Sequence, residues 1–325
     1  MNSSREQVAV ARDAVAVAAE VLGPIARRDQ PLGPLTTYRV GGAAALLAQP
    51  RTIDELALVG RAHLASGLPL LVVGRGSNLL VADAGFLGIA VSIAVVASDI
   101  ELPASADRVA SASVRAGGAV ALPTLARRTA AAGITGFEWA VGVPGSIGGA
   151  VRMNAGGHGS DMAACVEEVE IMDLTVPSRG IESWPVEQLH LRFRGSDLAD
   201  GQVVVAAHLG LRWGDRAQAE TTIAEIVRWR REHQPGGQNA GSVFVNPVPG
   251  ELSAGLLVDE LGLRGLRIGT ASVSEKHANF IQADEGGRAE DVRAVMEAVR
   301  RRVADEKGFL LRSEVRLVGF EEGGT

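Results

Sequence analysis

Apolar residues recur every three or four positions in several stretches of the chain, which is the spacing of a helix with one buried face. Glycine follows three of these stretches, at Gly67, Gly133 and Gly308, where helices commonly end. The stretches with this pattern are residues 1–22, 54–66, 119–132, 223–235 and 290–307. We predict a helix in each.

Short apolar or alternating runs lie between these helices and predict strands. They are residues 68–74, 166–174, 202–213 and 310–319. In the last run, alternation predicts Glu314 and Arg316 on one face and Val315 and Leu317 on the other. Mixed helices and strands indicate an α+β fold. The sequence pattern changes after the strand that ends near residue 213, which predicts a domain boundary there.

Composition narrows the class of protein. The chain has 325 residues, 46 % of them hydrophobic, with 32 Lys and Arg against 38 Asp and Glu. Intrinsic disorder is excluded, and the scattered basic residues and net charge of -6 argue against a nucleic-acid partner. One cysteine and dispersed histidines predict no structural metal. The apolar run from Leu87 to Ala97 is too short to span a membrane and the N-terminus is charged, so we expect a cytoplasmic protein without a membrane partner.

Glycine is unusually frequent, at 40 of 325 residues, and clusters at the ends of apolar segments. In VVGRGSNLL, the run from Gly74 to Asn78 lacks the third glycine of a dinucleotide fingerprint, because Leu79 takes that position. We interpret it as a turn whose main-chain N–H groups bind an anion. A plain connection between strands is the alternative.

A second glycine-rich stretch, GVPGSIGGAVRMNAGGHG, covers residues 142–159. Gly148 stands where a P-loop would carry lysine, which excludes that class of ATP site. Small residues allow a pyrophosphate or a flat ring to lie against the main chain. Close helix–strand packing is the alternative.

Several motifs in order resemble one family. They are TTYRVGGAA, VVGRGSNLLVADAGFLGIAV, GITGFEWAVGVPGSIGGAVRMNAGGHG, FRGS, NAGSVFVNP, AGLLVDELGLRG, SVSEKHANFI and SEVRLVG. From about residue 30 to 320 the chain resembles the UDP-N-acetylenolpyruvoylglucosamine reductases, flavoenzymes of peptidoglycan precursor synthesis. The resemblance implies a two-lobed FAD-binding region (1–95 with the N-terminal helix, and 96–212) and a C-terminal α+β substrate-binding domain (213–325).

The resemblance also implies FAD as cofactor and NADPH as reducing co-substrate, with UDP-N-acetylglucosamine enolpyruvate reduced to UDP-N-acetylmuramate. The implied FAD-binding residues are Arg39, Val40, Gly41, Gly42, Val73, Gly74, Arg75, Gly76, Ser77, Asn78, Leu79, Gly142, Val143, Pro144, Gly145, Ser146, Gly148, Gly149 and Ala150. The implied substrate-binding residues are Asn246, His277, Asn279 and Arg316.

Three catalytic residues are carried over by their motifs: Arg194 in FRGS, Ser242 in GSVFVNP and Glu314 in SEVRLVG. A guanidinium suits the enolate that forms after hydride transfer, and a hydroxyl suits protonation of its carbon. Glu314 would contact the substrate carboxylate or orient its neighbours, and burial there predicts a raised pKa. Without the motifs, a surface arginine, a turn serine and a solvent-facing glutamate would be the ordinary interpretations.

The chain departs from the family pattern at three positions. Phe193 replaces a usual tyrosine, Val245 a usual lysine and Ala283 a usual asparagine, which puts the diphosphate contacts in doubt more than the chemistry. The short separation of Arg194 from Ser242 indicates the branch without the inserted tyrosine loop. A flavin oxidase or dehydrogenase of the same architecture and a catalytically idle sugar-nucleotide-binding module are the alternatives.

Overall fold

The computed structural model of the chain describes residues 2–104, 111–248 and 250–321. The α-helices are α1 (Asn2–Leu22), α2 (Ile53–Ser66), α3 (Leu122–Ala131), α4 (Ile147–Arg152), α5 (Arg216–His233), α6 (Ala254–Glu260) and α7 (Ala289–Lys307). The strands are β1 (Ala26–Pro31), β2 (Ala43–Ala48), β3 (Leu70–Val73), β4 (Leu79–Val81), β5 (Phe86–Ser92), β6 (Ile100–Glu101), β7 (Ser111–Gly117), β8 (Ile134–Thr135), β9 (Gly156–Gly157), β10 (Ser160–Asp161), β11 (Val166–Asp173), β12 (Ile181–Pro185), β13 (Gln202–Trp213), β14 (Arg267–Ile268), β15 (Ala271–Val273), β16 (Ile281–Ala283) and β17 (Arg316–Val318). Helices therefore form in all five predicted stretches.

The chain divides into two compact units that do not follow sequence order. Unit 1 consists of Met1–Gln30, Ala45–Arg75 and Leu87–Trp229. Unit 2 consists of Pro31–Ala44, Gly76–Phe86 and Arg230–Thr325. Two short N-terminal segments are thus assigned to the same unit as the C-terminal third of the chain. The three consecutive parts expected from the sequence stay a prediction.

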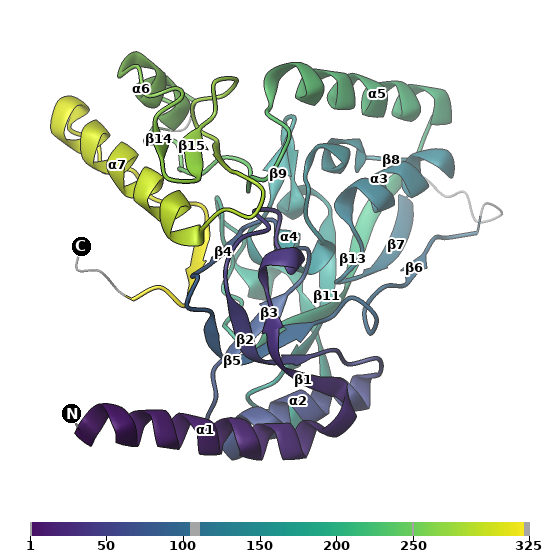
Figure 1. The fold of residues 1–325 in the computed structure, drawn as a ribbon. Helices are drawn as coiled ribbons and strands as arrows, with labels where there is room; N and C mark the ends of the chain where they lie inside the picture. Colours follow the sequence, from purple (N-terminus) through teal and green to yellow (C-terminus); the bar gives the residue numbers. More distant parts are fainter. Residues whose placement is uncertain (1, 105–110, 249, 322–325) are drawn as a thin grey trace. The chain divides into compact units, whose positions relative to one another are not determined.

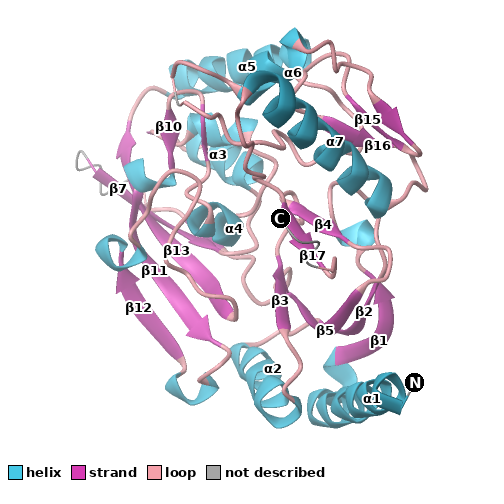
Figure 2. Ribbon diagram, turned by 90° about the vertical axis from the view of Figure 1, so that its left-hand side faces the viewer, coloured by secondary structure: helices cyan, strands magenta, loops and turns pink. Residues whose placement is uncertain are grey.

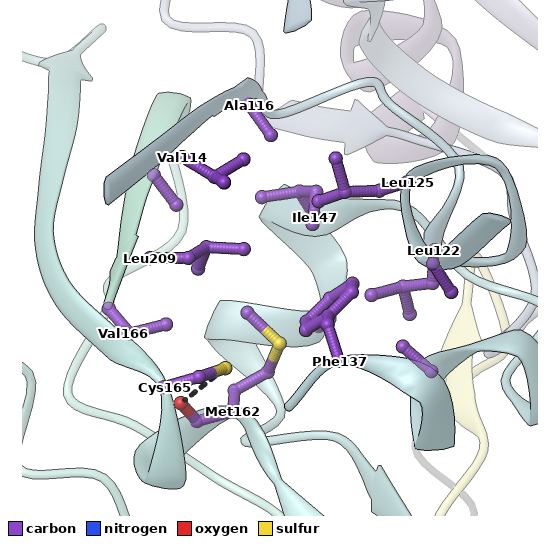
Figure 3. Packing of buried hydrophobic residues seen from close by; sticks show 14 of the residues in the cluster. Val114, Ala116, Leu122, Leu125, Phe137, Ile147, Met162, Cys165, Val166 and Leu209 are labelled. Carbon is purple, nitrogen blue, oxygen red and sulfur yellow. Dashed lines mark hydrogen bonds between the residues drawn. The ribbon is translucent and has the colours of Figure 1, made fainter. Parts of the chain in front are cut away.

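The larger sheet of unit 1 has the strand order β12-β11-β13-β7-β6, with β8 also paired to β13. Figure 2 shows its strands β12, β11, β13 and β7. Strand β13 is buried on both faces, because Leu209 and Leu211 lie in one apolar cluster and Val203 and Val205 in another. In the first cluster Phe137 packs with residues of α3, α4 and this sheet, as Figure 3 shows. This core supports the glycine-rich stretch that begins at residue 142.

A second sheet, in the order β1-β2-β5-β3, contributes to the other apolar cluster of unit 1. Helices α1 and α2 lie side by side against it (Figures 1 and 2) and bury Val15, Ala18, Leu22, Leu56 and Val59. Those positions repeat at helical spacing, which is why the sequence predicted both helices. Within the described ranges, no helix combines the length and apolar content that a membrane crossing requires.

In unit 2, α7 lies beside the small sheet β14-β15-β16 (Figure 1). The helix buries Val292, Val295, Met296, Val299 and Val303. The same core contains residues from far earlier in the chain. They are Tyr38, Val40 and Leu80. Strand β4 also pairs in parallel with β17, which follows Glu314 in the chain (Figure 2).

A reciprocal cap fastens the segment after β4 to helix α7. The Asp83 carboxylate accepts the Ala289 N–H at 2.9 Å, and the Glu290 carboxylate accepts the Asp83 N–H at 3.0 Å. Asp83 thus satisfies an N–H in the first turn of α7, which would otherwise lack a partner, and Glu290 satisfies the main-chain N–H of Asp83. The cap therefore fixes residues 76–86 to the C-terminal part of unit 2.

Candidate active site

Ser242 follows a tight turn that an asparagine stabilises. Gly241 has a φ of +77°, a conformation that suits glycine. The Asn239 side-chain oxygen accepts the Gly241 N–H at 3.0 Å, and its amide group donates to the carbonyls of Gly236 and Gly237. The sequence interpretation did not include Asn239, although an asparagine two residues before a turn glycine is a recognised turn signal.

Unit 2 brings the segments of Ser242 and Glu314 together. The Glu314 N–H donates to the Val243 carbonyl at 2.8 Å, and the Val245 N–H donates to the Arg312 carbonyl at 2.9 Å. Two residues that sequence reasoning placed in one site therefore lie on adjoining, hydrogen-bonded segments.

The predicted strand around Glu314 is wrong in its extent. Strand β17 begins at Arg316, after Glu314, because the Glu314 N–H is bonded to the Val243 carbonyl and the chain bends before it joins β4. Val315 is 4 % exposed and Leu317 is 40 % exposed, so the two residues that alternation placed on one face differ in burial.

Asn78 lies between the glycine-rich turn and Glu314. Its side-chain amide donates to the Glu314 carbonyl at 2.9 Å, and its own carbonyl accepts the Arg316 N–H at 3.0 Å. The turn residues from Gly76 to Leu79, predicted to bind the cofactor, therefore adjoin a predicted catalytic residue within unit 2.

The glycines at 41, 42 and 76 are required by the protein's own main chain. A Cβ at Gly41 would lie 2.2 Å from the Val81 carbonyl oxygen, and one at Gly76 would lie 2.2 Å from that of Leu35. At Gly42 the distance to the Asp83 oxygen would be 2.3 Å. The sequence interpretation attributed these glycines to ligand approach. The close packing of main chain supplies a sufficient reason for them, so their presence alone does not indicate a ligand.

Arg39 and Val40 directly precede Gly41, and their side chains differ in burial. Arg39 is exposed at a φ of +54°, and its N–H donates to the Thr36 hydroxyl at 3.1 Å. Val40 is buried in the core of unit 2, as Val73 is buried at the end of β3 in unit 1. The buried side chains leave only main-chain groups of these two valines for contact with a ligand.

In unit 1 the end of β3 meets the second glycine-rich stretch. A Cβ at Gly74 would lie 2.5 Å from the Ser146 hydroxyl oxygen, and Gly149 has the same oxygen 3.8 Å from its Cβ position as its nearest neighbour. Gly74 and Gly149 are exposed to solvent. Gly142 differs, because a Cβ there would lie 2.9 Å from the His158 ring. Gly74, Ser146 and Gly149 thus form a patch of small residues around one hydroxyl.

Arg194 occupies a strained position in a two-residue turn. Arg192 and Gly195 exchange N–H···O=C bonds at 3.0 Å, which makes Phe193 and Arg194 the central residues. Arg194 has a φ of +58°, costly for a side chain with Cβ, and its guanidinium lies 5.5 Å from the Phe193 ring centroid. Backbone strain of this kind is frequent at functional sites.

Arg152, at the end of α4, connects this turn to the glycine-rich stretch within unit 1. Its carbonyl accepts the Ser196 hydroxyl at 2.8 Å, and its guanidinium contacts Asp200 at 2.5 Å and the Ala199 carbonyl at 3.0 Å. Sequence reasoning did not include Arg152, since nothing in its local pattern indicates a contact with residues more than 40 positions away.

The proposed substrate-binding residues have defined places in unit 2. The Asn246 side chain accepts the Ala254 N–H at the start of α6 at 3.1 Å, and Arg316 begins β17. His277 is half-buried against the Phe280 ring, and burial together with nearby Arg264 lowers its pKa, which favours the neutral ring.

Asn279 is 4 % exposed and hydrogen-bonds the main chain of Phe244 through both ends of its amide. Among the departures from the family pattern, Phe193 is 57 % exposed and Val245 is half-buried. Ala283 lies at the end of β16, where its N–H donates to the Gln238 carbonyl at 3.0 Å. The structure therefore gives Asn279 and Ala283 places in main-chain hydrogen bonding.

Comparison with known proteins agrees with this arrangement. Residues 44–175 match the family model of an FAD binding domain, and residues 233–318 match that of the C-terminal domain of UDP-N-acetylenolpyruvoylglucosamine reductase. These matches confirm the predicted α+β fold with an FAD-binding region and a C-terminal domain.

Whole-chain relatives extend the match. The chain is 43 % identical over 299 residues to the UDP-N-acetylenolpyruvoylglucosamine reductase of Heliobacterium modesticaldum, covering 91 % of each. It is 39 % identical over 295 residues to that of Acidiphilium cryptum, covering 90 % of this chain and 91 % of the relative. The crystal structure of the Thermus caldophilus enzyme superposes with a TM-score of 0.72 at 33 % identity, over 90 % of this chain and 99 % of the other. This chain belongs to the UDP-N-acetylenolpyruvoylglucosamine reductase family.

Proposed function

We propose that the chain reduces the enolpyruvyl ether of UDP-N-acetylglucosamine enolpyruvate to UDP-N-acetylmuramate, with FAD as cofactor and NADPH as electron donor. The observation that carries the proposal is the hydrogen-bonded pair of segments that brings Ser242, Glu314 and the Gly76–Leu79 turn together in unit 2. Membership of the reductase family supplies the substrate class. The cytoplasm is the proposed location, since NADPH and nucleotide sugars are supplied there.

The chemical character of several residues in this chain suits the binding of FAD. The Gly74, Ser146 and Gly149 patch of unit 1 offers main chain and a hydroxyl without bulky side chains, as close approach of a pyrophosphate requires. Residues 39–42 and 76–79 of unit 2 stay predicted FAD-binding residues. FAD bound there would supply hydride transfer from NADPH to the CH2 carbon of the substrate.

The side chains then complete the reduction. Hydride addition leaves an enolate delocalised into the substrate carboxylate, and Arg194 stabilises that negative charge with its guanidinium. The Ser242 hydroxyl donates its proton to the carbon next to the carboxylate, which completes the C–H bond and leaves an alkoxide that takes a proton from its surroundings. Glu314 binds the substrate carboxylate in its protonated form or orients these groups. Its raised pKa stays a prediction.

Separating the two half-reactions tests the proposal. Anaerobic NADPH should bleach the flavin absorbance of the purified protein, and the UDP-enolpyruvyl sugar should restore it. Ser242→Ala should leave bleaching within about twofold and slow restoration by about 10²–10⁴-fold, the usual range for general acid catalysis.

The matched control is Ser98→Ala, which removes an exposed turn hydroxyl that donates to the Val95 carbonyl. It should leave both half-reactions unchanged. Equal slowing of bleaching and restoration by Ser242→Ala would contradict the assigned role. Restoration by a ketone instead of the UDP-enolpyruvyl sugar would indicate an oxidase or dehydrogenase, and absence of bound flavin would contradict the whole proposal.

A further inference from the structure

The structure points to a positioning role for Asn279 that differs from direct contact with substrate. We propose that Asn279 holds the main chain after Ser242 in register, so that the Ser242 hydroxyl is aimed at the substrate carbon. This inference rests on the proposed function, because it assigns Asn279 an effect that passes through Ser242.

Three hydrogen bonds connect Asn279 to the two residues after Ser242. The Asn279 carbonyl accepts the Val243 N–H at 2.9 Å. Its side-chain oxygen accepts the Phe244 N–H at 2.9 Å, and its side-chain amide donates to the Phe244 carbonyl at 2.9 Å. One residue therefore takes the place of a neighbouring strand on this side of the segment.

The opposite side of the same segment is held by the Glu314 region. Val243 donates to Asn279 and accepts from Glu314, so its peptide groups link the two sides. Phe244 forms an antiparallel bridge with Ser313. Displacement on the Asn279 side would therefore move Ser242 relative to Glu314.

Burial separates this role from substrate contact. Asn279 is 4 % exposed, and the Phe244 side chain beneath it is 1 % exposed. The turn that carries Asn279 is itself fixed, because the Asn279 N–H donates to Nδ1 of His277 at 3.2 Å and the Phe280 N–H donates to the His277 carbonyl at 3.0 Å. The amide is therefore rigidly placed against main chain and shielded from ligands in solvent.

Two substitutions and a double mutant test the inference in the full-length flavoenzyme. Asn279→Asp keeps the acceptor for the Phe244 N–H and loses the donor to its carbonyl, whereas Asn279→Ala loses both. The rate of flavin re-oxidation at saturating UDP-enolpyruvyl sugar should fall by about 10- to 100-fold, the scale of a displacement of roughly 1 Å. Flavin reduction by NADPH should stay within about twofold, and the substrate concentration for half-maximal rate should change little.

The double mutant isolates the path through Ser242. In a Ser242→Ala background, Asn279→Asp should add no further slowing, because the hydroxyl that it positions is absent. Asp291→Ala is the matched control for general loosening of unit 2. The Asp291 carboxylate accepts the N–H and hydroxyl of Thr270 at 2.8 and 2.7 Å, and its removal should leave both half-reactions unchanged.

The outcomes separate this inference from the proposed function. Two results would overturn the positioning role in favour of a direct contact. One is a double mutant whose re-oxidation is slowed by the product of the two single-mutant factors. The other is a rise in the half-saturating substrate concentration with an unchanged limiting rate. Re-oxidation at the normal rate in Asn279→Asp and Asn279→Ala would also overturn it. Normal re-oxidation in Ser242→Ala alone would instead overturn the proposed role of Ser242, and the inference with it.

Discussion

Tyr38 is the single tyrosine of the chain, and its hydroxyl is buried without a hydrogen-bond partner among the described residues. The side chain is 0 % exposed in the core of unit 2. A buried polar group without a partner costs about 1–3 kcal/mol. Tyr38→Phe keeps the ring and removes the oxygen, so we expect the free energy of unfolding to rise by about 1 kcal/mol.

The same burial makes stability depend on pH. Burial raises the pKa of Tyr38 above its usual value of 10, so the folded protein keeps the phenol proton where the unfolded chain releases it. This contribution is fully present below pH 10 and is lost as the pH rises above it. Between pH 10 and 11 the loss amounts to about 1 kcal/mol. The stability advantage of Tyr38→Phe should grow by that amount over the same interval.

Two measurements check the prediction. Urea unfolding of both proteins at pH 8, 10 and 11 gives the difference in unfolding free energy. Tyrosinate absorbance near 295 nm, with Tyr38→Phe as the blank to cancel flavin and tryptophan, reports this one side chain. We expect no tyrosinate in the folded protein at pH 11 and a step only on unfolding. A tyrosinate signal near pH 10 without unfolding, or a Tyr38→Phe protein of lower stability, would refute the reasoning.

Two further predictions concern charged groups. Hydrogen bonds from Arg115, and then from His208, lower the pKa of Glu170 to about 2, so this carboxylate stabilises the fold above pH 4.5 and the stabilisation is lost as the pH falls towards 2. After screening by solvent, the contribution of this carboxylate to the unfolding free energy is about 1–2 kcal/mol. In urea unfolding, Arg115→Met should lower the unfolding free energy by that amount at pH 6 and by much less at pH 2.5. An equal difference at both pH values would contradict this. Asp83→Ala should lower the unfolding free energy by about 1–2 kcal/mol through loss of the cap on α7, whereas Asp83→Asn keeps the acceptor and should lose less; equal losses would argue against the cap.

Helices and their ends were predictable because their causes are local. The apolar spacing of residues 54–66 and the glycine after them predicted α2, and Gly67 takes the expected left-handed conformation at a φ of +70°. The same holds for α7 and Gly308. The motifs that carry the proposed catalytic residues could also be recognised in the sequence, because each consists of neighbouring residues.

Contacts between distant segments were not predictable, and they account for the errors. The main-chain hydrogen bond between Glu314 and Val243 replaces the start of the predicted strand. The sequence pattern around neither residue predicts this bond. The close approach of the Val81 and Asp83 carbonyls to Gly41 and Gly42 was likewise not foreseen, whereas the predicted role of these glycines in FAD binding stays a prediction. The amide of Asn279 likewise serves main chain 35 positions away.

Assembly of unit 2 from three separated segments constrains the order of events during synthesis. Residues 31–44 and 76–86 leave the ribosome before the helix and strand that complete their packing, α7 and β17, have been translated. Tyr38, Val40 and Leu80 therefore stay without their final neighbours until α7 and β17 have emerged. Translation halted before α7 would leave these apolar side chains open to chaperones and to aggregation, which makes residues 289–318 decisive for the fate of segments translated well before them.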